Sequence, residues 1–364
     1  MQSFVCGTRL CFGADAPAAL AGLHAERVLL VTDPYFAENG TAARYAAAFP
    51  GAQVEIFSDV APDPPLSLVA QGVARLQALE LVAQGARALA EFRPQAVVAF
   101  GGGSAIDCAK GIAALGGLPV RLVAVPTTSG SGSEVTSFAI LTQGGIKHPL
   151  VDPALRPELA ILDPALLEAL PPRLIAESGM DAVSHCVEAA AAREASPVTD
   201  ALAHSACRTL LRLLPRSFAG ETAVRGDVHL AASMAALAFD NAGLGACHAL
   251  AHALGGRFHV AHGRLCAMLL PHVIAHHAAE DPHPYAALAA ACGLPGVRGL
   301  TGTIVRLRAR LGLPASLTEA GVPREAVLEA ETDVLEAALE DPCASQAPAP
   351  LTRDALQVLL RQVL

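Results

Sequence analysis

The chain is 364 residues long, and a chain of this length usually divides into two packed domains. Hydrophobic residues make up 53% of it and charged residues only 16%, so it can bury a large apolar core. Its net charge of −9 argues against a nucleic-acid partner, because such surfaces need clustered Lys and Arg.

The N-terminal residues carry no positively charged segment followed by an apolar core, so we expect no secretory signal. No uninterrupted apolar run approaches about 20 residues, so we expect no membrane span. The nine cysteines form no CxxC pair. They predict reduced thiols in a cytoplasmic protein and argue against a disulfide framework or a cysteine-ligated metal.

Short, β-rich apolar runs alternate with Ala- and Leu-rich helical stretches in the first half of the chain. Continuous apolar strands separated by helices predict a parallel sheet that is covered on both faces. Binding sites in such sheets lie at the carboxyl ends of the strands. The predicted strands are residues 27–32, 53–57, 96–100, 121–125 and 159–162, and the predicted helices include residues 65–92 and 105–115.

The strand pattern stops after Leu170-Pro171-Pro172, and helical periodicity follows it. We therefore predict an α/β dinucleotide-binding domain at residues 1–170 and an all-α domain at residues 171–364, with the active site between them. The predicted helical segments are residues 174–218, 227–254, 264–279, much of 285–340, and 352–363, the last capped by Thr352.

Glycines follow the predicted strand 96–100, in the sequence Gly101-Gly102-Gly103-Ser104, and a helix is predicted from Ala105. Glycines let the backbone approach a ligand closely, and the first N–H groups of a helix favour an anion such as a pyrophosphate. The loop is not a GxGxxG fingerprint, so a tight strand-to-helix turn stays the alternative.

Two other strand ends carry polar residues. The loop of residues 126–134 is rich in Ser, Thr and Gly and could wrap a ribose or a nicotinamide edge, or serve only as a turn. Asp33 follows the first predicted strand. Its carboxylate could bind adenosine ribose hydroxyls and repel a 2′-phosphate, or it could cap a helix.

Histidines recur at helical spacing in the second half. Asp181 and His185 are four residues apart, His248 and His252 repeat this spacing, and His262 follows. The spacing places each pair on one helix face. Buried imidazoles are costly without partners, and a divalent metal bound by histidines and a carboxylate would remove that cost. A single histidine would be read as a hydrogen-bonded core residue, but the two pairs with His262 favour a metal site.

These motifs together resemble the iron-containing (group III) alcohol dehydrogenases, whose fold is shared with dehydroquinate synthase and glycerol dehydrogenase. The resemblance covers nearly the whole chain and is carried by residues 101–110, 126–134, 179–185, 241–252 and 261–263. Within the family, residues 3–10 and 62–79 look like the 1-propanol dehydrogenases of propanediol-utilisation systems.

The resemblance implies a set of site residues. A ferrous ion, or zinc in some members, would be bound by Asp181, His185, His248 and His262. His252 would lie outside the metal ligands, beside the nicotinamide, and relay the alcohol proton. The residues implied to bind NAD(H) are Gly102, Gly103 and Ser104 at the pyrophosphate, Thr127, Thr128 and Ser131 at the nicotinamide, Lys147, and Asp33, which would favour NAD over NADP.

The implied reaction interconverts a short-chain primary alcohol and its aldehyde, such as propanol and propionaldehyde, by hydride transfer to nicotinamide C4. A homodimer in the cytoplasm is implied, with a bacterial microcompartment as the alternative location. Other substrates of the same fold stay open: lactaldehyde or a diol, glycerol, 4-hydroxybutyrate and maleylacetate. A dehydroquinate synthase-type lyase would need clustered basic residues near the histidines, and a non-catalytic binding module would not need an intact ligand set.

Overall fold

The computed structural model describes residues 3–58, 60, 93–115, 119–143 and 146–364. Its contacts form two compact units. The α/β unit consists of Cys6–Thr128 and Ser133–Glu168, and the helical unit of Met1–Val5, Ser129–Gly132 and Ala169–Leu364. The pattern of predicted strands and helices did not indicate that the segments Met1–Val5 and Ser129–Gly132 belong to the helical unit. The predicted helix 65–92 and the family motif at residues 62–79 lie outside the described residues.

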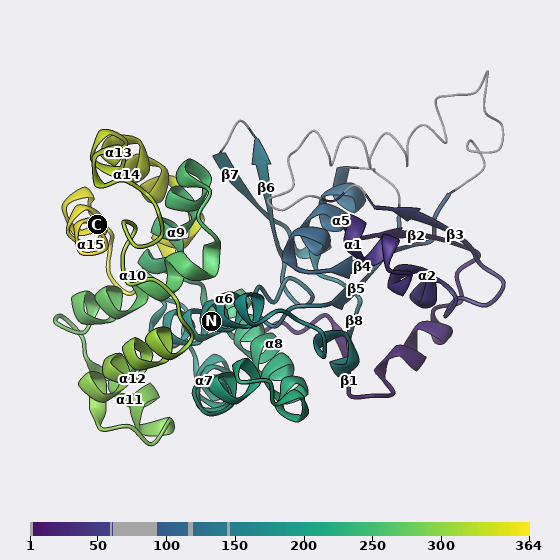
Figure 1. The fold of residues 1–364 in the computed structure, drawn as a ribbon, viewed down its shortest axis with the longest axis horizontal. Helices are drawn as coiled ribbons and strands as arrows, with labels where there is room; N and C mark the ends of the chain where they lie inside the picture. Colours follow the sequence, from purple (N-terminus) through teal and green to yellow (C-terminus); the bar gives the residue numbers. More distant parts are fainter. Residues whose placement is uncertain (1–2, 59, 61–92, 116–118, 144–145) are drawn as a thin grey trace. The chain divides into compact units, whose positions relative to one another are not determined.

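A six-stranded parallel sheet forms the centre of the α/β unit, in the order β1-β8-β5-β4-β2-β3 (Figure 1). The predicted parallel sheet is thus confirmed, and only β1 among its strands was not predicted. The strands are β1 (Arg9–Phe12), β2 (Arg27–Val31), β3 (Gln53–Phe57), β4 (Ala96–Gly101), β5 (Arg121–Pro126) and β8 (Leu159–Leu162).

Both faces of this sheet are buried. Val28 and Leu30 of β2 belong to one hydrophobic cluster, and the intervening Leu29 and Val31 belong to another. Since successive side chains of a strand point to opposite faces, a strand buried on both sides must be apolar throughout. The clusters are completed by a 3-10 helix (Ala16–Leu23), α1 (Pro34–Glu38), α2 (Thr41–Ala46) and α5 (Gly103–Leu115).

A separate antiparallel pair, β6 (Phe138–Gln143) and β7 (Ile146–Val151), was not predicted. Two polar residues of α5 hold β6 in place. Asp107 Oδ2 accepts a hydrogen bond from the backbone N of Ile140 at 3.1 Å, and the buried Lys110 Nζ donates to the carbonyl oxygen of Phe138 at 2.5 Å. These two residues of the glycine-loop motif therefore have structural roles.

The second unit is helical, as predicted, with breaks that the periodicity did not show. Gly243, with φ of 95°, ends one helix near the middle of the predicted segment 227–254. Thr352 caps the last helix, because its Oγ1 accepts from the backbone N of Ala355 at 3.2 Å. The helices are α6 (Pro172–Ala191), α7 (Pro197–Phe218), α8 (Arg225–Ala242), α9 (Ala246–Phe258), α10 (His262–His277), α11 (His283–Ala291), α12 (Gly296–Arg310), α13 (Arg324–Glu329), α14 (Glu331–Glu340) and α15 (Arg353–Arg361).

Across the described residues, no single helix is long and apolar enough to cross a membrane, although two bent pairs of consecutive helices meet the length and composition test together.

Candidate active site

Three ionisable side chains of α6 lie on one face of that helix. Asp181, His185 and Glu188 follow one another at spacings of four and three residues, and all three are buried. Carboxylates are rarely buried without a partner that compensates their desolvation. This face of α6 therefore needs partners, and they come from α9 and α10.

Glu188 orients the first histidine of α9. Its Oε1 accepts from the backbone N of Cys247 at 2.8 Å, and its Oε2 lies 2.6 Å from Nδ1 of His248. A carboxylate is favourable at a helix N-terminus, and a proton on Nδ1 leaves Nε2 as the nitrogen with a free lone pair. Gly245 permits this contact, because a Cβ there would lie 2.9 Å from Glu188 Oε1.

A close approach of α10 to α6 places His262, the first residue of α10. The next residue, Gly263, lies against the backbone of Glu177, and a Cβ at this position would stand 1.9 Å from the Glu177 carbonyl oxygen. Arg264 Nε also donates to Glu177 Oε1 at 2.5 Å. Only glycine allows the two backbones to approach so closely.

Three imidazoles converge on one carboxylate oxygen. Asp181 Oδ1 lies 3.3, 3.6 and 3.7 Å from the Nε2 atoms of His262, His248 and His185, respectively. A tetrahedral centre with bonds of about 2.1 Å has ligand atoms about 3.4 Å apart. The three distances from Asp181 Oδ1 are therefore close to those between ligand atoms around a divalent metal.

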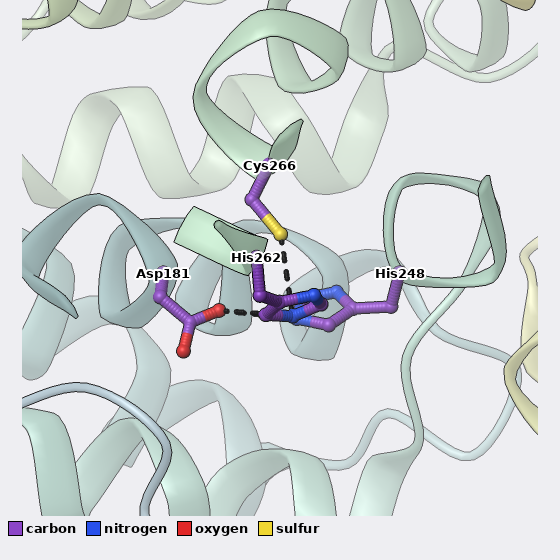
Figure 2. Close-up of side chains that lie close together, drawn as sticks. All are labelled: Asp181, His248, His262 and Cys266. Atoms are coloured by element: carbon purple, nitrogen blue, oxygen red, sulfur yellow. Dashed lines mark hydrogen bonds and ion pairs between the residues drawn. The ribbon is translucent and has the colours of Figure 1, made fainter. Parts of the chain in front are cut away.

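Two of the converging atoms also lack a hydrogen bond. In the part of the chain that the structure describes, Asp181 Oδ1 and His248 Nε2 are buried and have no hydrogen-bond partner. Figure 2 shows Asp181 and His248 pointing toward His262 from opposite sides. Buried lone pairs that face one another are costly unless a cation lies between them. The residues present thus fit a metal ion.

The charges of the cluster suit metal binding. Burial raises the pKa of Asp181, but His185 and His262 outweigh this effect and hold it well below its usual value. Burial lowers the pKa of His185 to about 3. The carboxylate is therefore ionised and His185 neutral around neutral pH, as metal ligands require, whereas His248 and His262, whose pKa values are raised, must lose a proton when a metal binds.

His252 has a different partner. Its Nδ1 lies 2.8 Å from Oδ2 of Asp341, whose Oδ1 accepts from the backbone N of Cys343 at 2.8 Å. Burial lowers the pKa of His252, and Asp341 opposes that shift. The ring stacks on His262 with a centroid distance of 5.0 Å. A proton on Nδ1 leaves Nε2 free to accept another, so the predicted relay role is chemically possible and stays a prediction.

Cys266 was missed by the sequence interpretation. Its sulfur belongs, with ligand atoms of Asp181, His248 and His262, to a group that all lie within 4.8 Å of one another (Figure 2). The available signal was its spacing of four residues after His262, which places both on one face of α10. Glu188 had a similar signal, three residues after His185. Asp341 had none, because it is 89 residues from His252.

Except for Lys147, the predicted cofactor residues of the α/β unit lie at one edge of its sheet, where the strands end. Asp33, Gly102 and Thr127 follow β2, β4 and β5, which are neighbours in the sheet. A Cβ on Gly102 would lie 3.5 Å from Thr128 Oγ1, and one on Gly101 would lie 3.5 Å from Asp33 Oδ2. The strand order reverses between β2 and β4, which is where ligands bind in open α/β sheets. Gly103 and Ser104 begin α5 at the same edge.

Asp33 does cap a helix. Its Oδ1 accepts from the backbone N of Phe36 at 3.1 Å, at the start of α1. Burial raises its pKa, against the opposing effect of the backbone N–H groups of Phe36 and Tyr35. The other oxygen, Oδ2, lies near Gly101, and the binding of a ribose by Asp33 stays a prediction.

Ser131 and Lys147 are not brought to that edge by the sheet. Ser131 belongs to the segment Ser129–Gly132 of the helical unit, where Ser129 Oγ lies 2.9 Å from His229 Nδ1. Lys147 lies on β7, paired with Thr142 of β6. Their cofactor roles stay predictions.

Comparison with known proteins places the chain in a family. Residues 7–164 match the iron-containing alcohol dehydrogenases, and residues 175–364 match the C-terminal part of the Fe-containing alcohol dehydrogenase family. The chain is 37% identical over 384 positions to the 1-propanol dehydrogenase PduQ of Citrobacter freundii, with 100% of both chains covered.

Solved structures agree with this match. An iron-containing alcohol dehydrogenase from Thermococcus thioreducens is 29% identical, with a TM-score of 0.91 and 99% of each chain covered. Sulfoacetaldehyde reductase from Bifidobacterium kashiwanohense, in complex with NAD+, is 25% identical, with a TM-score of 0.85 over 100% of this chain and 98% of that one. The predicted fold class and dehydrogenase activity are confirmed. The chain belongs to the iron-containing alcohol dehydrogenase family.

Proposed function

We propose that the chain is an NAD(H)-linked alcohol dehydrogenase, dependent on iron or zinc, that interconverts a short-chain primary alcohol and its aldehyde. The observation that carries the proposal is the convergence of Asp181, His185, His248 and His262, with two buried atoms that lack a hydrogen bond within the described residues. The similarity to a 1-propanol dehydrogenase supports a substrate of the size of propanol or propionaldehyde. The NAD+ complex of sulfoacetaldehyde reductase supports the cofactor.

The two predicted domains would have different roles. In this proposal residues 1–170 bind NAD(H), and residues 171–364 hold the metal and the catalytic groups. The glycine loop at Gly102 and Gly103 would bind the pyrophosphate through the N-terminal N–H groups of α5. The family resemblance supports a homodimer in the cytoplasm or in a bacterial microcompartment.

The ligand residues set the charge of the site. A ferrous or zinc ion bound there would act as a Lewis acid toward the oxygen of the substrate. When no other anionic ligand is bound, Asp181 contributes the single negative charge, so the site would keep a net positive charge that lowers the pKa of the substrate hydroxyl. Glu188 fixes the ring of His248 through the Nδ1 contact, which keeps Nε2 directed at the site.

His252 would accept and return the proton of the substrate hydroxyl. During alcohol oxidation its Nε2 would accept the hydroxyl proton, directly or through a water, and during aldehyde reduction it would return that proton. Asp341 would stabilise the resulting imidazolium through its 2.8 Å contact with Nδ1. Asp341 is in this scheme a positioning residue.

Metal analysis combined with an activity panel tests the proposal. The purified protein should contain iron or zinc and oxidise NADH with C2–C4 aldehydes, faster than with maleylacetate. His248→Ala and His185→Ala should lose most of the metal and nearly all activity while the circular dichroism spectrum is preserved. His283→Ala, an exposed histidine of the same unit, is the matched control. Full activity in a metal-free variant would reject the role of the metal.

A further inference from the structure

Cys266 brings a thiol into the metal centre. It lies on α10, four residues after His262, and its side chain is completely buried, with a relative exposure of 0%. Its Sγ lies 3.5 Å from Nε2 of His262. This is the same nitrogen that faces Asp181 Oδ1 at 3.3 Å, so the thiol and the carboxylate share one neighbour.

The surroundings of the thiol indicate that its sulfur is a metal ligand. The sulfur and the ligand atoms of Asp181, His248 and His262 are all within 4.8 Å of one another, and His185 is not part of that group. Within the described residues, Asp181 Oδ1 and His248 Nε2 are buried and have no hydrogen bond. Figure 2 shows the sulfur of Cys266 directed toward His262, between the side chains of Asp181 and His248. Carboxylate, imidazole and thiol thus face a common point.

We propose that the Cys266 sulfur binds the metal in the resting enzyme, beside Asp181, His248 and His262. This inference rests on the metal site of the proposed function. On binding, the S–H bond breaks, a sulfur–metal bond forms and the proton leaves to solvent, with no change of oxidation state. A thiolate is a soft donor, and soft donors favour Zn2+ over harder cations. The ratio of zinc affinity to iron affinity is therefore higher at this site than at the same site without the thiol.

Cobalt substitution tests the inference directly. The whole protein is stripped with a chelator and reloaded with Co2+, and both its absorption spectrum and its cobalt content are measured. We expect a near-ultraviolet thiolate-to-cobalt charge-transfer band in the unmodified protein. Cys266→Ser and Cys266→Ala should lose the band and still bind cobalt. Cys207→Ala is the matched control, because this cysteine of α7 is also completely buried, belongs to no candidate metal-binding group within the described residues, and should leave the band intact.

One measurement on the unmodified protein keeps the test decisive if a variant fails to fold, and a second compares metal affinities in a folded variant. X-ray absorption on the unmodified zinc protein should show a sulfur scatterer at about 2.3 Å. The zinc affinity of Cys266→Ser should fall by at least about 10-fold, and its iron affinity by less.

The outcomes separate the two proposals. Cobalt bound without a charge-transfer band, or zinc without a sulfur scatterer, would overturn the thiol ligand and leave the proposed function standing. A band that persists in Cys266→Ser would also overturn it, because another thiol would then be the ligand. Failure of the unmodified protein to bind either metal would overturn the metal site itself and with it the proposed function.

Discussion

Nδ1 of His248 lies 2.6 Å from a carboxylate oxygen of Glu188, and the backbone N–H of His248 donates to the same oxygen at 3.3 Å. The Glu188 carboxylate therefore fixes both the start of α9 and the orientation of the His248 ring, which α9 carries. Such partners of metal-binding histidines set which nitrogen is free to bind.

We expect Glu188→Gln to weaken metal binding by about 10- to 100-fold, because an amide stabilises the Nδ1–H tautomer of His248 less than a carboxylate does. Competition with a chelator of known affinity measures the effect. Glu158→Gln is the control, since Glu158 forms an exposed ion pair with Arg121 in the other unit. Equal metal affinities for Glu188→Gln and the unmodified protein would remove Glu188 from the site.

His252→Ala should keep its metal and its fold while kcat falls roughly 100-fold or more, as for the loss of a general base. Asp341→Asn should act in the same direction and shift the pH profile. Asp341 opposes the effect of burial on the pKa of His252, so its removal lowers that pKa further and moves the acidic limb of alcohol oxidation to lower pH. Metal content measured beside kcat separates the cases: lost metal would make His252 a ligand, and an unchanged rate would make it structural.

The unmodified enzyme should prefer NADH to NADPH, because Asp33 would repel a 2′-phosphate at a cost on the order of 1–3 kcal/mol. Asp33→Ser is the sharper variant, since serine can still cap α1 while it removes the charge. Asp33→Gly also removes the charge but loses the side-chain cap. The ratio of kcat/KM for the two cofactors is the readout, and equal values in the unmodified enzyme would count against this role.

Metal affinity should rise with pH. Burial lowers the pKa of His262, but Cys266 and Asp181 outweigh it and raise the value to about 9 in the metal-free protein. His262 is therefore protonated below that pH, and a metal must displace its proton. Because the pKa of His248 is also raised well above its usual value, the metal displaces more than one proton, and the apparent affinity should increase by at least about tenfold per pH unit from about pH 7 to about pH 9. A flat dependence over this range, measured by calorimetry in buffers of different ionisation enthalpy, would contradict the prediction.

The parts of the fold that the sequence predicts best are those with continuous apolar patterns. Apart from Arg27 and Arg121 at their starts, strands β2, β4 and β5 lack polar side chains, because both faces of the sheet are buried. The strand β1 was missed because it has four residues, and none of them is fully buried. The hairpin strand β7 was missed because Lys147, His148 and Pro149 interrupt its pattern.

The candidate site was likewise predicted only in part from the sequence. Spacing within one helix pairs Asp181 with His185, because residues four apart share a face. The convergence of α6, α9 and α10 depends on contacts that no local pattern records, such as the backbone of Glu177 against Gly263. For the same reason the pairing of His252 with Asp341 was not foreseen.

The predicted ligands are spread over three helices, with His262 lying 81 residues beyond Asp181 along the chain. An ion bound there acts as a cross-link between α6, α9 and α10, and the unfolded chain offers no preformed equivalent. At a thousandfold excess of free metal over its dissociation constant, this linkage adds about 4 kcal/mol to the free energy of unfolding. The supply of metal in the cell would then govern how long the folded protein survives, as well as whether it can react.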